Sequence, residues 1–188
     1  VRDVGGIVVI RRAVSAGNVD VPTGVDIFDN TIDGWSNSGA GQGHGIVVEG
    51  TQIRVSGNTI TNSDVAIQRQ AGNDTHPGDS DQDATNDYFS RGNAQQTCAA
   101  VNGNDVSGGN TVGERDVDTR PGPASMEPIV ENDDTKRFFC SITAALADAL
   151  TDAGHELAVY DGITVEEQVV INKSVTLRPR GGMPATIQ

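Results

Sequence analysis

Four aspartates, Asp79, Asp81, Asp83 and Asp87, recur along one polar stretch and could supply carboxylate oxygens to a metal ion. Hard oxygen ligands suit Ca²⁺, and alternating aspartates are typical of calcium-binding loops. The glycine that makes the sharp turn of an EF-hand loop is absent. In a chain this acidic, a solvated run of aspartates is the competing interpretation. Calcium is therefore the one cofactor that the sequence suggests.

Catalysis would have to rest on charged residues near the start of the chain, namely Asp26, Asp29, Asp33, His44 and Arg54. Paired carboxylates or a carboxylate with a basic group can act as acid and base. A structural role competes, because Asp26 and Arg54 stand at one repeat offset and would form an ion pair between repeats. The three histidines of the chain are scattered, which argues against a metal–histidine site. We expect no catalytic residues.

Asn30 and Asn58 occupy equivalent positions in an internal repeat. Val25–Ile32 aligns with Ile53–Ile60 at one offset, and this offset places Asn30 on Asn58. Short strands that recur with an asparagine at a fixed turn are typical of stacked repeats. We expect the two side-chain amides to form a ladder that bonds neighbouring turns.

Two further side-chain types could be modified. Cys98 and Cys140 are the only cysteines, and in an extracellular protein a disulfide between them is favoured over free thiols. Asn73 and Asn172 each begin an Asn-x-Ser/Thr triplet in a predicted turn, which is the acceptor pattern for glycosylation. Such triplets are common by chance, and Asn172 has a competing role in its turn.

Charge is the strongest feature of the composition. The net charge is −13, from 26 acidic against 13 basic residues, and only Lys136 and Lys173 are lysines. This bias resembles that of haloarchaeal proteins, whose carboxylate repulsion is screened by high salt. An ordinary acidic extracellular protein is the competing interpretation. A phosphate backbone needs a basic face, so the composition argues against nucleic-acid binding.

Targeting segments are not evident in the sequence. No apolar run approaches the length of a transmembrane helix, so we expect no membrane span. No signal peptide is present, and the chain begins at Val1 without methionine, as a processed product or a fragment would.

Hydrophobic periodicity predicts short strands and one helix. The β-branched runs Ile46–Val48, Ile53–Val55 and Val65–Ile67 are separated by turn residues. An apolar stripe of helical period runs through residues 142–153, with Ser141 as the expected N-cap and Gly154 as the C-cap glycine.

Three segments, Gly-Ile-Val-Val at 45–48, Val-Ser-Gly-Asn-Thr-Ile at 55–60 and Val-Ala-Ile-Gln at 65–68, resemble the right-handed parallel β-helix repeat proteins of the pectin-lyase-like superfamily. The resemblance implies an all-β fold, a right-handed parallel β-helix (a solenoid) with one short capping α-helix and a long irregular insertion. Residues 1–70 would form β-helix rungs, 71–140 an irregular acidic arm or insertion, and 141–188 the capping helix with the first rungs, within a single domain.

The segment that resembles the start of such a fold stands at the end of this chain. Family members commonly open with a short helix followed by strands like Lys173-Ser-Val-Thr-Leu177. Three explanations remain open: a circular permutation, a window from a longer array, or completion of one subunit's open end by the next. Unpaired strand edges and a contact that does not close would give fibres.

These observations together predict an extracellular or cell-surface structural protein of a halophile, a filament or surface-layer subunit. It would self-assemble head to tail by completing the open ends of the β-helix. Its partners would be other copies of itself, with surface glycans as a second candidate. The alternatives are a carbohydrate-binding adhesin or viral spike domain, and a polysaccharide lyase or hydrolase of the pectin-lyase-like type.

Overall fold

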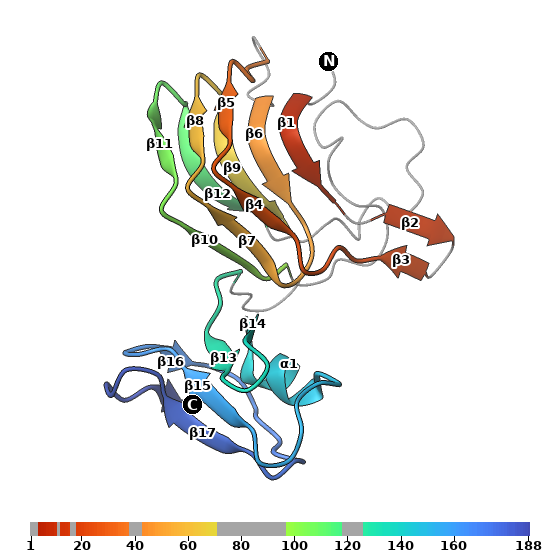
Figure 1. Cartoon of the computed structure of the whole chain (residues 1–188), viewed down its shortest axis with the longest axis vertical. Coiled ribbons are helices and arrows are strands. Elements are labelled where there is room, and N and C mark those ends of the chain that lie inside the picture. Colours follow the sequence, from red (N-terminus) through yellow and green to blue (C-terminus); the bar gives the residue numbers. More distant parts are fainter. Residues whose placement is uncertain (1–3, 11, 16–17, 38–42, 71–96, 118–125) are drawn as a thin grey trace. The chain divides into compact units, whose positions relative to one another are not determined.

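A computed structural model describes residues 4–10, 12–15, 18–37, 43–70, 97–117 and 126–188 (Figure 1). The chain divides into two compact units, Val1–Met126 (unit 1) and Glu127–Gln188 (unit 2). The boundary between them falls inside the segment 71–140 that the sequence assigned to an irregular arm. The described part of that segment contains five strands, β10 to β14.

Unit 1 contains a three-strand motif that occurs three times. Its first copy comprises β4 (Asp26–Phe28), β5 (Thr31–Asp33) and β6 (Gly43–Val48); the second comprises β7 (Ile53–Ser56), β8 (Thr59–Thr61) and β9 (Val65–Gln70); the third comprises β10 (Ala99–Asn102), β11 (Asp105–Gly108) and β12 (Val112–Val117). We call these the three repeats.

Each repeat contributes one strand to each of three parallel sheets. The sheets have the orders β4-β7-β10, β5-β8-β11 and β1-β6-β9-β12, where β1 is Val4–Val9. Strands β2 (Arg12–Ser15) and β3 (Asn18–Asp20) form a separate antiparallel pair. The neighbouring repeats are in register, with Ile27 beside Val55 and Ile32 beside Ile60.

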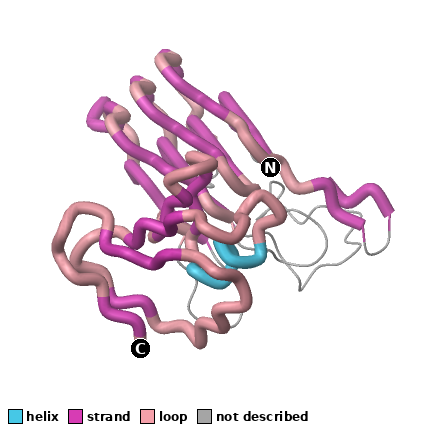
Figure 2. Tube along the Cα trace, turned by 60° about the horizontal axis from the view of Figure 1, so that its bottom comes forward, coloured by secondary structure: helices cyan, strands magenta, loops and turns pink. Residues whose placement is uncertain are grey.

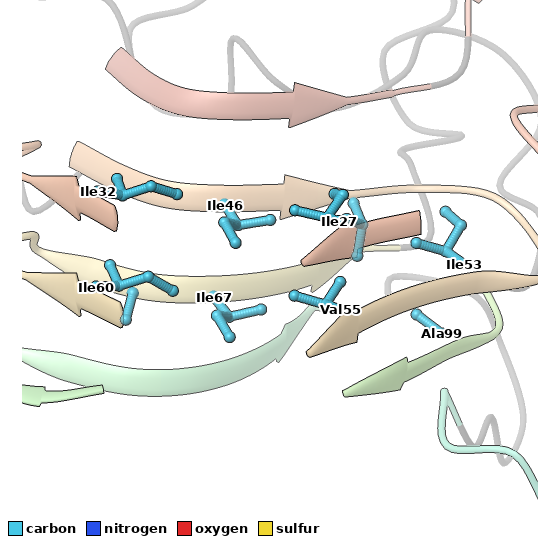
Figure 3. Close-up of a cluster of buried hydrophobic side chains, with 10 residues drawn as sticks. Ile27, Ile32, Ile46, Ile53, Val55, Ile60, Ile67 and Ala99 are labelled. Carbon is cyan, nitrogen blue, oxygen red and sulfur yellow. The ribbon is translucent and has the colours of Figure 1, made fainter. Parts of the chain in front are cut away.

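Equivalent side chains of successive repeats pack together between these sheets. Figure 3 shows Ile32 next to Ile60, Ile46 next to Ile67 and Ile53 next to Ala99. The alternation of buried and exposed residues in the short strands β4, β5 and β7 gives each repeat a thin inward stripe. Stacking the repeats joins these stripes into one apolar core, which explains how a chain with 4% aromatic residues forms one.

The turn between the first and second strands of each repeat has one fixed geometry. Asp29, Gly57 and Gly103 take the equivalent position with φ of 57°, 68° and 63°. This left-handed conformation suits glycine and tolerates aspartate. The residue that follows it is an asparagine in all three repeats, so the turn sets the asparagines at one place in the stack.

Unit 2 mixes parallel and antiparallel pairing. Its strands are β13 (Val130–Asn132), β14 (Arg137–Phe139), β15 (Glu156–Val159), β16 (Thr164–Val165), β17 (Thr176–Pro179) and β18 (Thr186–Ile187). One sheet has the order β14-β13-β15-β17, in which β13 is antiparallel to both neighbours and β15 is parallel to β17. Strands β16 and β18 form a second, parallel sheet.

Helix α1 (Ile142–Ala147), cyan in Figure 2, is shorter than the apolar stripe over 142–153 predicts. Ser141 caps it as expected, since its Oγ accepts from Ala144 N at 3.0 Å. The helix ends at Asp148, whose carboxylate is bound by Arg137 Nε at 2.7 Å. Lys173 Nζ donates to the carbonyls of Asp148 and Thr151. These bonds satisfy carbonyl groups that the chain leaves without helical partners when it turns away from α1.

The expected fold class is therefore wrong. A single solenoid with a capping helix would carry its parallel sheets through residues 1–70 and 141–188, whereas the described strands fall into six separate sheets in two units. The antiparallel hairpin of β13 and β14 interrupts a purely parallel arrangement in unit 2. The repeat pattern of the sequence predicted the parallel pairing of strands in unit 1. It did not predict the antiparallel pairing of β13 in unit 2.

Candidate functional site

Asn30, Asn58 and Asn104 form a directional ladder across the three repeats. Asn30 donates to Asn58 Oδ1 from its backbone N at 3.1 Å and from Nδ2 at 2.9 Å. Asn58 donates to Asn104 Oδ1 from the same two atoms at the same two distances. Asn58 Nδ2 also donates to Ile27 O at 3.0 Å. Between the asparagines themselves, the bonds therefore all run one way, from the N–H groups of one member to the Oδ1 of the member in the next repeat.

The ladder ends with unlike groups. Among the described residues, Asn30 Oδ1 accepts no hydrogen bond, because it is the first member of the ladder. At the other end, the backbone N–H of Asn104 has no acceptor within the described ranges, while its Nδ2 donates to Val55 O. One end therefore presents an acceptor and the other end presents a donor.

The Asn30 end of unit 1 has a step in its sheets. Strand β1 extends the sheet of β6 by one position, while β4 and β5 remain the outermost strands of the other two sheets. Among the described residues, no strand occupies the position beside β4 or the position beside β5 on the side where β1 extends its sheet. We call this step the notch.

A hollow of about 400 Å³ lies within the notch. Its walls are Gly6 and Ile7 of β1, strand β5, Asn30 and Trp35. The indole of Trp35 lies close to Gly6, where an added Cβ would be 2.9 Å from Trp35 Nε1. Trp35 is 36% exposed and Phe28 of β4 is 51% exposed, so apolar surface remains open at this end.

Asp33 places a carboxylate on the rim of the notch. Its Oδ1 accepts from Thr61 Oγ1 at 2.5 Å and from Asn62 Nδ2 at 2.7 Å. These bonds, the one from Thr61 first, hold the pKa of Asp33 below its usual value. The rim is therefore negatively charged at neutral pH.

Unit 2 has an exposed edge of two parallel strands. Strand β17 is paired on one side by β15, and β18 is paired on one side by β16. Thr186 and Gln188 donate their backbone N–H groups to Ile163 O and Val165 O of the covered side. Ile187 is 46% exposed and Met183, before β18, is 61% exposed. We call β17 and β18 the unit 2 edge.

The five charged residues considered for catalysis do not gather at one place. Arg54 lies 3.6 Å from Asp26, with both side chains half exposed, in the ion pair between repeats that the sequence indicated. His44 is buried and its Nε2 lies 3.3 Å from Arg115 Nη2. Asp33 is held on β5, and Asp29 occupies the left-handed turn position. No acid–base pair suited to a reaction results among these residues.

Other predicted sites fall partly outside the described residues, namely Asp79, Asp81, Asp83 and Asp87 for calcium and Asn73 for glycosylation. Asn172 is exposed between β16 and β17, and its glycosylation stays a prediction. Within the described ranges, no group of three His, Cys, Asp or Glu side chains could hold a metal ion. The same ranges contain no helix with the length and apolar character needed to cross a bilayer.

Cys98 and Cys140 form a disulfide, as the sequence predicted. Cys98 directly precedes β10 in unit 1, and Cys140 directly precedes Ser141, the N-cap of α1 in unit 2. The bond therefore joins the two units covalently.

Two residues of the site were missed from sequence. Asn104 completes the ladder, but its offset of 46 from Asn58 differs from the offset of 28 between Asn30 and Asn58. Gly103-Asn104 repeats the Gly57-Asn58 dipeptide and so indicates a further repeat, but the predicted ladder included only Asn30 and Asn58. Nothing in the sequence context of Trp35 indicates the hollow beside it.

Comparison with family models, with curated proteins and with solved structures gives no match for this chain. The resemblance to the pectin-lyase-like superfamily therefore stays a prediction. The function has to be argued from the geometry of the notch and of the unit 2 edge.

Proposed function

We propose that the protein is a structural subunit that joins copies of itself head to tail by adding strands at its open sheet edges. The observation that carries the proposal is the notch, where β4 and β5 end their sheets one position before β1 ends its own. Outermost strands present backbone N–H and C=O groups that can pair with another chain. A notch two strands wide favours an added pair of parallel strands over a loose surface contact.

The polarity of the asparagine ladder favours a head-to-tail joint. A two-fold contact between two notches would bring the acceptor Asn30 Oδ1 against its own copy, and neither would supply a donor. A contact between unlike surfaces avoids this mismatch. Such contacts repeat along a line when they do not close into a ring, so a filament is the expected assembly.

Charge and the disulfide support an extracellular, salt-rich environment. Structural disulfides persist in oxidising compartments, and this chain uses both of its cysteines in one. A net charge of −13 would oppose association in dilute buffer, because copies repel each other. High salt screens that repulsion, so the proposed subunit would assemble best in brine.

Salt should also stabilise the folded chain. We expect the melting temperature, followed by circular dichroism, to fall as NaCl is lowered from molar to millimolar concentration, because carboxylate repulsion is then unscreened. A matched series in sucrose is the control, because sucrose is excluded from the protein surface but does not screen charges. A melting temperature that does not change with NaCl would contradict the halophilic assignment.

Electron microscopy of the purified protein in molar NaCl tests the proposal. We expect unbranched filaments one subunit wide, which shorten when the salt is removed. Single particles at all salt and protein concentrations would overturn the proposal. A closed ring would retain the head-to-tail contact but overturn the filament.

A further inference from the structure

We infer that the unit 2 edge of one copy fills the notch of the next, with β17 added to β4 and β18 added to β5; this inference rests on the proposed self-association. The notch offers two adjacent open positions, in the sheets of β4 and β5. The unit 2 edge offers two strands, each of which pairs on one side only within the part of the chain that the structure describes. The number of strands on the two surfaces therefore agrees.

The order and direction of the strands also agree. In unit 1 the chain passes from β4 to β5, and both are parallel to their partners β7 and β8. In unit 2 it passes from β17 to β18, and both are parallel to their partners β15 and β16. The strands of the unit 2 edge can therefore add to β4 and β5 as parallel neighbours, in the same chain order.

The sequences of the strands set a register. Thr186-Ile187 of β18 matches Thr31-Ile32 of β5, and Thr176-Leu177 of β17 matches Asp26-Ile27 of β4 in apolar position. Within unit 1, Thr31 lies beside Thr59 and Ile32 beside Ile60. The same rule places Thr186 beside Thr31 in the joint.

This register satisfies the open end of the asparagine ladder. The residue before the matching threonine donates its N–H to the next repeat, as Asn30 N does to Asn58 Oδ1 at 3.1 Å. Ala185 takes that position in unit 2, and its N–H has no acceptor among the described residues. Ala185 N–H therefore meets Asn30 Oδ1.

The backbone pairing continues in the same way. Thr59 N donates to Asn30 O at 2.8 Å, and Thr186 N donates to Ile163 O at 3.0 Å. Thr31 stands one repeat before Thr59, so in the joint it would donate to Ala185 O. One added strand thus completes both the ladder and the edge of β5.

Side chains of the unit 2 edge fit the exposed surface of the notch. Ile187, 46% exposed, stacks on Ile32 and enters the hollow beside Trp35. Arg178 lies opposite Phe28 in this register, and a guanidinium stacks well on an aromatic ring. The side chain of Arg178 is 39% exposed, although it already binds Glu156 and Asp133. One basic residue thereby reaches an edge that carries aspartates.

The occupant is a second copy of the chain. The acceptor Asn30 Oδ1 of the notch and the donor Ala185 N–H of the unit 2 edge are unlike groups on unlike surfaces of the same chain. A head-to-tail contact between two copies pairs these groups and leaves the same two surfaces available at the ends of the assembly. Docking within one chain is the outcome that the experiment must distinguish.

Engineered disulfides test the register directly. Adjacent strands lie about 4.8 Å apart, within the Cα separation that a disulfide spans. Full-length Thr31→Cys and Thr186→Cys proteins are mixed in molar NaCl under mild oxidation. We expect a dimer of the two variants on a non-reducing gel. The control pairs Thr31→Cys with Thr164→Cys, because Thr164 of β16 lies beside Thr186 on the covered side and should not cross-link.

A variant in the hollow gives an independent measurement. Ile187→Asp should reduce the light-scattering mass to that of one chain. Met183→Asp should leave assembly unchanged, because Met183 is also an exposed apolar residue but lies outside the strands. If the wild type assembles but the cysteines do not cross-link and Ile187→Asp still assembles, this joint is wrong and the proposed function stands. If the wild type never assembles, the proposed function fails. Cross-linking of Thr31→Cys/Thr186→Cys within a single chain would overturn the assignment to a second copy.

Discussion

Replacing Asn58 with alanine should lower the free energy of unfolding by about 3 kcal/mol. The side chain is fully buried, and it links three repeats through bonds to Asn30, Ile27 O and Asn104 Oδ1. Its removal leaves the buried carbonyl of Ile27 with one donor fewer and separates the two remaining asparagines. Each buried polar group left without a partner costs about 1–3 kcal/mol.

Asn30→Ala is the matched control for this prediction. Asn30 has the same turn position, but it is half-buried and has a neighbouring asparagine on one side only. We expect a loss of about 1 kcal/mol, because water can reach the groups that it leaves. Urea denaturation followed by circular dichroism measures both variants. Equal losses would contradict a ladder whose central member carries most of the stabilisation.

Removing the disulfide should have an effect of similar size. The bond between Cys98 and Cys140 closes a loop of 43 residues, counted inclusively. Chain-entropy estimates for such a loop give about 4 kcal/mol of stabilisation. We therefore expect the Cys98→Ser/Cys140→Ser protein to unfold at a much lower urea concentration than the wild type.

The reduced wild-type protein is the control for the serine variant. Both lack the cross-link, so their urea midpoints should agree within error. A double variant as stable as the oxidised wild type would show that the bond adds nothing to folding. A reduced wild type that stays as stable as the oxidised form would contradict the prediction in the same way.

The sequence predicted the local order of unit 1 because its repeats reuse the same residues. Val25–Ile32 and Ile53–Ile60 share an asparagine, a threonine and three apolar positions, and these segments contain β4, β5, β7 and β8, which pair in register. A periodic pattern reports which residues face inward and where turns occur. It therefore located the ladder through Asn30 and Asn58.

The pairing of strands in unit 2 could not be predicted in this way. Strands β13 and β14 are three residues long, and such short apolar runs do not indicate whether a partner is parallel or antiparallel. The turn between them depends on Lys136 at a φ of 59°. Because β13 then pairs with β15, one local turn changes the architecture of the whole unit.

The end of α1 depends on contacts that are distant in sequence. The apolar stripe continues past Ala147, but Arg137 and Lys173 bind the side chain and carbonyl of Asp148. Helical periodicity carries no information about such partners. The hollow of the notch likewise could not be predicted from periodicity, since it is lined by Gly6 and Trp35, which are distant in the sequence.

The central claim is that separate copies join end to end, and the mass of the native protein against concentration tests it most directly. Multi-angle light scattering is measured in molar NaCl, with the disulfide intact, over a hundredfold range of protein concentration. The account predicts a mean mass that rises with concentration without reaching a fixed small multiple of one chain. A mass that stays at one chain throughout the range would contradict it.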